Sequence, residues 1–157
     1  MTEKPAQELR RGWTTGACAA AAARAAYTAL LENEFPDPVT ITLPGGQRPA
    51  FSLARHAVTE ESAEAAIVKD AGDDPDVTHG ALVVVRVRAL AGGEGVRFRA
   101  GEGVGTVTRE GLSLAVGEPA INPEPRRMIA AEIAEVAAQH HAPGDVEVEI
   151  AIPGGDR

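Results

Sequence analysis

The densest cluster of polar side chains lies between residues 69 and 80. It contains Lys69, Asp70, Asp73, Asp74, Asp76, Thr78 and His79. Carboxylates can bind a hard cation through oxygen, and an imidazole can act as a general base or a ligand. The spacing lacks the alternating ligands and the closing Glu of a calcium loop. The cluster is therefore either a catalytic surface or a solvated turn, in which Asp74 caps a short helical turn that begins at Pro75.

A second candidate lies at Thr14, Thr15 and Gly16, where a long Ala-rich helix is expected to begin. The first turn of a helix leaves N–H groups unpaired and carries about half a positive charge. Small residues let an anion approach these groups, and Arg10 and Arg11 add positive charge. A closely packed helix with Thr15 as its N-cap explains the same residues without a ligand.

Cys18 is the only cysteine, which excludes an internal disulfide and a multi-cysteine zinc site. It could be a nucleophile at the start of the helix. No histidine lies near it in the sequence, however, and a small Cys among alanines is usually a core residue. We expect Cys18 to be structural.

Two further segments combine glycines with rigid or hydrogen-bonding residues. Gly101, Gly103 and Gly105 resemble a phosphate cradle, but the segment lacks the Gly-Lys-Ser/Thr ending of a nucleotide loop and the full Rossmann pattern. These glycines can equally mark a bulge or a close approach of two backbones. Asn122, in a Pro-rich stretch, offers an amide to a ligand or simply belongs to a turn before a helix.

Composition limits the functional classes. The chain has 157 residues, of which 44% are hydrophobic and only 3% aromatic, which predicts one domain with a core of Ala, Val, Ile and Leu. A net charge of −8 disfavours general nucleic-acid binding and binding to an anionic membrane. The N-terminus lacks the order of a signal peptide, and no segment is apolar enough to span a membrane, so we expect a cytoplasmic protein.

Hydrophobic periodicity predicts helices near the two ends of the chain and strands in the middle. The helices are expected over 17–31, ending near Asn33, and over 126–139. The strands are expected over 39–43, 49–58, 65–68, 81–90, 96–100 and 146–152, with 92–95 as a hairpin turn from which 96–100 returns. Val85 and Val87 should face the core, and Arg86 and Arg88 the opposite side. This order predicts an α+β fold, a two-layer sandwich with helices packed on one face of a largely antiparallel sheet.

Taken together, four segments resemble the CbiD family, whose members are cobalt-precorrin-5B C(1)-methyltransferases. The four occur in the family's order, and the match spans nearly the whole chain. They are 10–23 (RRGWTTGACAAAAA), 68–80 (VKDAGDDPDVTHG), 101–108 (GEGVGTVT) and 117–123 (GEPAINP).

The resemblance implies that a methyl group passes from S-adenosylmethionine to carbon 1 of the corrinoid ring, with cobalt present only as part of the substrate. It implies no metal site of the protein's own. The residues expected to line the catalytic site are Lys69, Asp70, Asp73, Asp74 and His79. Those expected to bind substrate are Arg11, Thr14, Thr15, Gly16, Gly101, Gly103, Gly105 and Asn122.

One departure from the family pattern concerns length. Family members continue into a second Gly-rich α/β region, which is the expected main site of the methyl donor. The chain of 157 residues is therefore expected to correspond to a single N-terminal domain, as a truncated or split protein, inactive alone. Its oligomeric state stays open, a homo-oligomer included. Two other functions remain: a non-catalytic corrinoid-binding or scaffold domain, and a small phosphate-binding protein that uses the Gly-rich loop.

Overall fold

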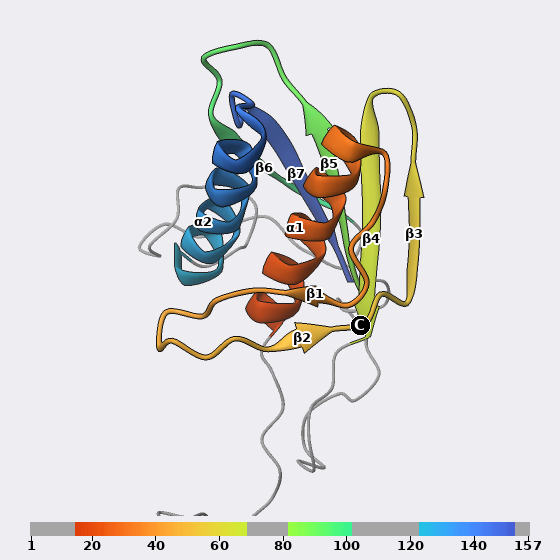
Figure 1. Cartoon of the computed structure of the whole chain (residues 1–157), viewed down its shortest axis with the longest axis vertical. Coiled ribbons are helices and arrows are strands. Elements are labelled where there is room, and N and C mark those ends of the chain that lie inside the picture. Colours follow the sequence, from red (N-terminus) through yellow and green to blue (C-terminus); the bar gives the residue numbers. More distant parts are fainter. Residues whose placement is uncertain (1–14, 69–81, 102–122, 153–157) are drawn as a thin grey trace, which may run out of the picture.

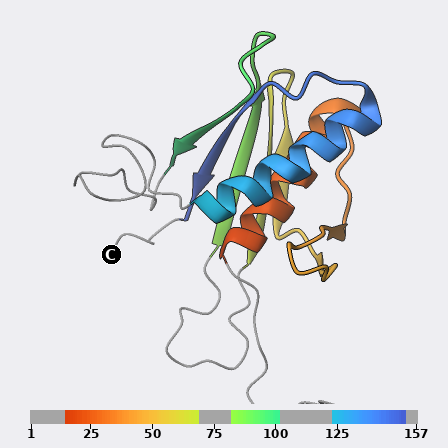
Figure 2. The same cartoon turned by 90° about the vertical axis from the view of Figure 1, so that its left-hand side faces the viewer.

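The structure is a computed structural model that describes residues 15–68, 82–101 and 123–152. Two helices pack on one face of a five-stranded sheet, and a two-stranded arm lies beside them (Figures 1 and 2). This is the predicted two-layer α+β sandwich. The elements are α1 (Thr15–Glu32), β1 (Val39–Thr40), β2 (Ala50–Phe51), β3 (Arg55–Val58), β4 (Ser62–Val68), β5 (Leu82–Ala89), β6 (Val96–Ala100), α2 (Pro123–His140) and β7 (Val146–Ala151).

Helix α1 forms because its sequence is almost a run of alanine, the residue with the highest helix propensity. Small side chains on every face let the sheet, the arm and α2 approach closely, so most of the helix is buried. Cys18 lies in this core with 1% of its surface exposed, as expected. The helix ends at Glu32, which agrees with the predicted end near Asn33, and the φ of 63° at Asn33 is typical of a left-handed cap. Its amide donates to the carbonyl of Ala29 at 2.6 Å.

The five-stranded sheet has the order β3-β4-β5-β7-β6, and all neighbours are antiparallel except β6 and β7. The predicted hairpin between β5 and β6 is therefore wrong, because β7 lies between them. Asp145, just before β7, explains the insertion. Its carboxylate accepts hydrogen bonds from the amides of Gly93 (3.1 Å) and Gly95 (2.7 Å), and its carbonyl accepts one from Leu90 (2.9 Å). These bonds hold the turn after β5 open around the start of β7.

The segment predicted as one strand over 49–58 forms two strands in different sheets. The arm pairs β1 with β2, whereas β3 pairs with β4. Between them the Leu53 amide donates to Asp37 Oδ1 at 3.1 Å, and the Ala54 amide donates to the Ala66 carbonyl at 2.7 Å. The chain therefore leaves the arm and joins the main sheet at this point.

The core lies between the helices and the sheet. Val85 and Val87 are fully buried there, while Arg86 and Arg88 lie on the open face, as predicted. The two helices run in the same direction. Pro125 of α2 lies against Gly16 near the start of α1, and His140 lies against Glu32 at the other end.

Candidate functional site

One end of the domain gathers the starts of both helices and the ends of three strands; we call it the motif end. The sheet register aligns Val68 with Leu82, Val84 with Ala151, and Ala100 with Ile150. The end of β4, the start of β5, and the ends of β7 and β6 therefore follow one edge of the sheet. Both helices begin at the same end (Figures 1 and 2). The residues that define the motif end are Thr15, Val68, Leu82, Gly101, Pro123 and Ala151.

The four segments singled out in the sequence all border the motif end. Segment 10–23 enters α1, segment 68–80 joins β4 to β5, segment 101–108 follows β6, and segment 117–123 leads into α2. Segments far apart in the sequence thus leave the core at one place. The predicted site residues within the described part are Thr15, Gly16 and Gly101. Those outside the described residues are Arg11, Lys69, Asp70, Asp73, Asp74, His79, Thr14, Gly103, Gly105 and Asn122, and their roles stay predictions.

Thr15 is the first helical residue of α1, at the position where a cap was predicted. Gly16 permits close packing of the two helix starts, because a Cβ there would lie 3.1 Å from Pro125 Cγ. Since the helices are parallel, the positive ends of both dipoles face the motif end. This end therefore carries a local field that favours an anionic group, although the chain as a whole is acidic.

Gly101 lies close to the backbone of the neighbouring strand β7. Its amide donates to the carbonyl oxygen of Ile150 at 2.7 Å, and a Cβ at this position would lie 2.9 Å from that oxygen. Contact between β6 and β7 explains this glycine without a ligand. The structural interpretation therefore accounts for Gly101, and a role in substrate binding stays a prediction.

Sequence reasoning missed Arg126 in the first turn of α2. Its guanidinium lies 5.1 Å from the centre of the Phe98 ring on β6, a cation–π contact next to the motif end. Arginine in the first turn opposes the helix dipole, so it needs other interactions to hold it there. The pair Arg126 and Arg127 at a helix start was the available signal.

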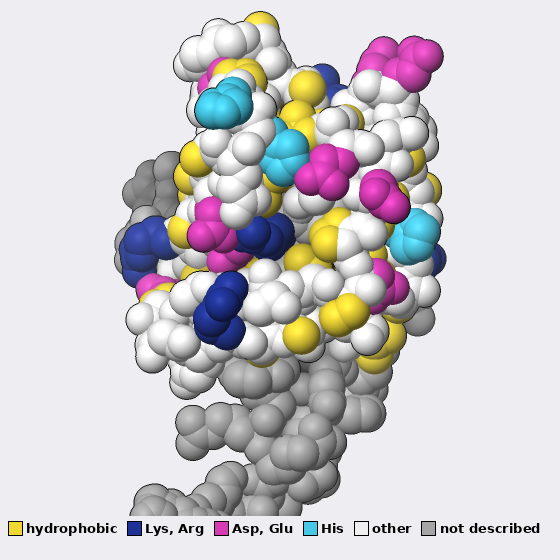
Figure 3. All heavy atoms as spheres, in the orientation of Figure 1, with side chains coloured by type: hydrophobic (Ala, Val, Ile, Leu, Met, Phe, Trp, Pro, Cys, Tyr) yellow, Lys and Arg dark blue, Asp and Glu magenta, His cyan; other side chains and the backbone are white. Residues whose placement is uncertain are grey.

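A buried ion pair fixes the two helices and the arm relative to one another. Glu132 of α2 is 5% exposed and accepts a hydrogen bond from Arg24 of α1 at 2.8 Å. Its other oxygen accepts one from the Thr42 amide of the arm at 3.3 Å. The more exposed Glu135 also binds Arg24. Burial alone would lower the pKa of Arg24, but the hydrogen bonds and charges of both glutamates raise it. Figure 3 shows charges of both signs side by side at this helix contact.

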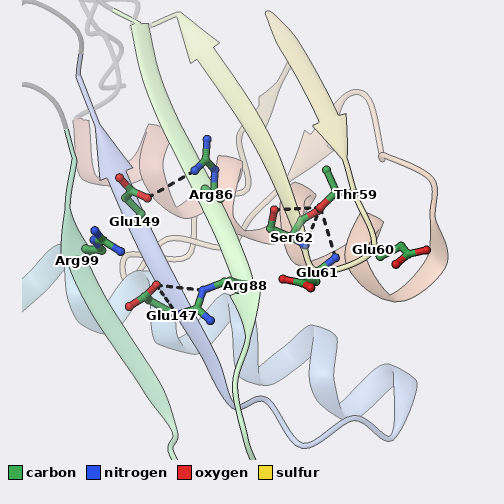
Figure 4. A pocket seen from close by; sticks show the side chains of 9 residues that line it. All are labelled: Thr59, Glu60, Glu61, Ser62, Arg86, Arg88, Arg99, Glu147 and Glu149. Carbon is green, nitrogen blue, oxygen red and sulfur yellow. Dashed lines mark hydrogen bonds and ion pairs between the residues drawn. The ribbon is translucent and has the colours of Figure 1, made fainter.

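Two hollows of the surface have linings that consist of described residues, one on the open face and one at the motif end. The larger, about 460 Å³, lies on the open face of the sheet and is lined by charged side chains (Figure 4). There Arg88 binds Glu147 at 3.0 Å, and Arg86 lies within 4.0 Å of Glu149. The β3–β4 turn, which borders this hollow, lies at the opposite end of β4 from Val68. The hollow is therefore a network of solvated ion pairs on the open face, and its lining runs from the β3–β4 turn to Arg99 and Glu149 beside Gly101.

The smaller hollow, about 400 Å³, lies at the motif end between residues 50–54 and the end of β4. Its described lining contains Ile67 and Val68 but no charged side chain. Val68 is 48% exposed and is one of two exposed large apolar side chains among the described residues, the other being Leu31.

Among the described residues, no group of three or more His, Cys, Asp or Glu side chains is arranged to hold a metal ion. Neither described helix is both long and apolar enough to cross a bilayer.

Comparison with known proteins identifies the family. The family model described as CbiD matches residues 2–157. The chain belongs to the CbiD family. It is 61% identical over 150 residues to a cobalt-precorrin-5B C(1)-methyltransferase of Paramagnetospirillum magneticum, covering 96% of this chain and 42% of that protein. It is 64% identical over 149 residues to the protein of the same name from Halorhodospira halophila, covering 95% of this chain and 40% of the relative.

A solved structure supports the same family and the fold. The crystal structure of a cobalamin biosynthesis protein, CbiD, from Archaeoglobus fulgidus superimposes with a TM-score of 0.62 at 25% identity. The match covers 92% of this chain and 44% of that one. The chain thus spans about two fifths of the length of the CbiD relatives it matches.

Proposed function

We propose that this chain forms part of an S-adenosylmethionine-dependent methyltransferase that methylates carbon 1 of cobalt-precorrin-5B in cobalamin biosynthesis. The observation that carries the proposal is family membership across almost the whole chain. The geometry supports it, because the four family-like segments border a single end of the domain. That end has two helix starts directed toward it, which suits a ligand with several carboxylate arms.

In this reaction an electron-rich ring carbon attacks the methyl carbon of the sulfonium donor. A carbon–carbon bond forms, the carbon–sulfur bond breaks, and the electron pair stays on the sulfur of S-adenosylhomocysteine. No covalent protein nucleophile is needed, so the protein acts by holding the two reactants in line. Such positioning can contribute roughly 7–11 kcal/mol. In the proposal, the helix starts hold the acidic arms, and the segment from Lys69 to His79 orients the ring.

We further propose that residues 1–157 act as a single domain and that the methyl donor binds mainly to a region outside it. The shorter span relative to the family supports this division. The chain alone is then expected to bind corrinoid but not to sustain methyl transfer. A cytoplasmic location belongs to the same proposal.

Transfer of a labelled methyl group from S-adenosylmethionine to cobalt-precorrin-5B tests the proposal. The full-length Halorhodospira halophila relative serves as the active comparator. Titration of this chain with a cobalt corrinoid and with S-adenosylmethionine separates the outcomes. Corrinoid binding without turnover supports the proposal. Absence of corrinoid binding contradicts it, and sustained turnover by the chain alone contradicts the division between domains.

A further inference from the structure

We draw no further inference here: the strongest candidate, the charged hollow on the open face of the sheet between the β3–β4 turn and Arg99, is a solvated face on which Arg88 and Arg86 are held by Glu147 and Glu149, and nothing among the described residues shows what would occupy it.

Discussion

The two glutamates that bind Arg24 should differ strongly in their contribution to stability. Glu132 is 5% exposed and also accepts the Thr42 amide, whereas the Glu135 side chain is 57% exposed. Removing one partner of a buried pair costs about 3–5 kcal/mol. Because Glu135 remains to bind Arg24 in Glu132→Ala, we expect a smaller loss of about 2–3 kcal/mol. Glu135→Ala should cost about 0–1 kcal/mol, as for other exposed pairs.

Urea unfolding followed by far-ultraviolet circular dichroism measures both free energies. The loss in Glu132→Ala corresponds to a fall in Tm of roughly 4–12 °C for a domain of this size. Glu132→Gln keeps the shape of the side chain and part of its hydrogen bonding. Its free energy of unfolding should therefore lie between those of Glu132→Ala and the unchanged chain. Equal losses in Glu132→Ala and Glu135→Ala, or a larger loss in the second, would show that burial does not decide the strength of this contact.

Three other changes test separate parts of the fold by the same measurement. Gly101→Ala should lower the free energy of unfolding by about 1–3 kcal/mol, because its Cβ would meet a β7 carbonyl at 2.9 Å. Gly92→Ala, whose Cβ would have nothing within 4 Å, should change it by about 0.5 kcal/mol or less. Ile133→Ala, at a fully buried site, should cost about 2–5 kcal/mol. The pKa of His140 is raised above 6.5 by a backbone carbonyl one turn earlier and then by Glu32. The stability that protonated His140 contributes to the fold is therefore complete below about pH 6.5 and is lost as pH rises through the folded-state pKa. The urea midpoint of unfolding should therefore fall more between about pH 6 and about pH 8.5 in the unchanged chain than in His140→Gln.

The local structure followed from the sequence because it depends on neighbours along the chain. The alanines after Thr15 predicted a buried helix, and alternation around Val85 and Val87 separated core from open face. The order of strands depends on contacts between distant residues. No local pattern showed that Asp145 would bind the turn after β5 and that β7 would lie between β5 and β6.

The candidate site was predictable in its parts but not in its arrangement. The sequence identified the segments around Thr15, Lys69 and Gly101 by residue type. Their convergence depends on the parallel helices and on the position of β7, which the sequence did not reveal. The smaller hollow was missed for the same reason, since its two walls come from residues 50–54 and from the end of β4.

The sheet order has a consequence for how stability and binding are divided within the domain. Because β7 lies between β5 and β6, its end reaches the motif end inside the sheet, between the start of β5 and the end of β6. The opposite end holds the turns, where Asp145 and the contact of His140 with Glu32 fix the elements. Several contacts that fix the core thus lie away from the motif end or between the helices, as with Glu132. The core that supports the motif end is therefore held in part by contacts that a ligand at that end would not touch.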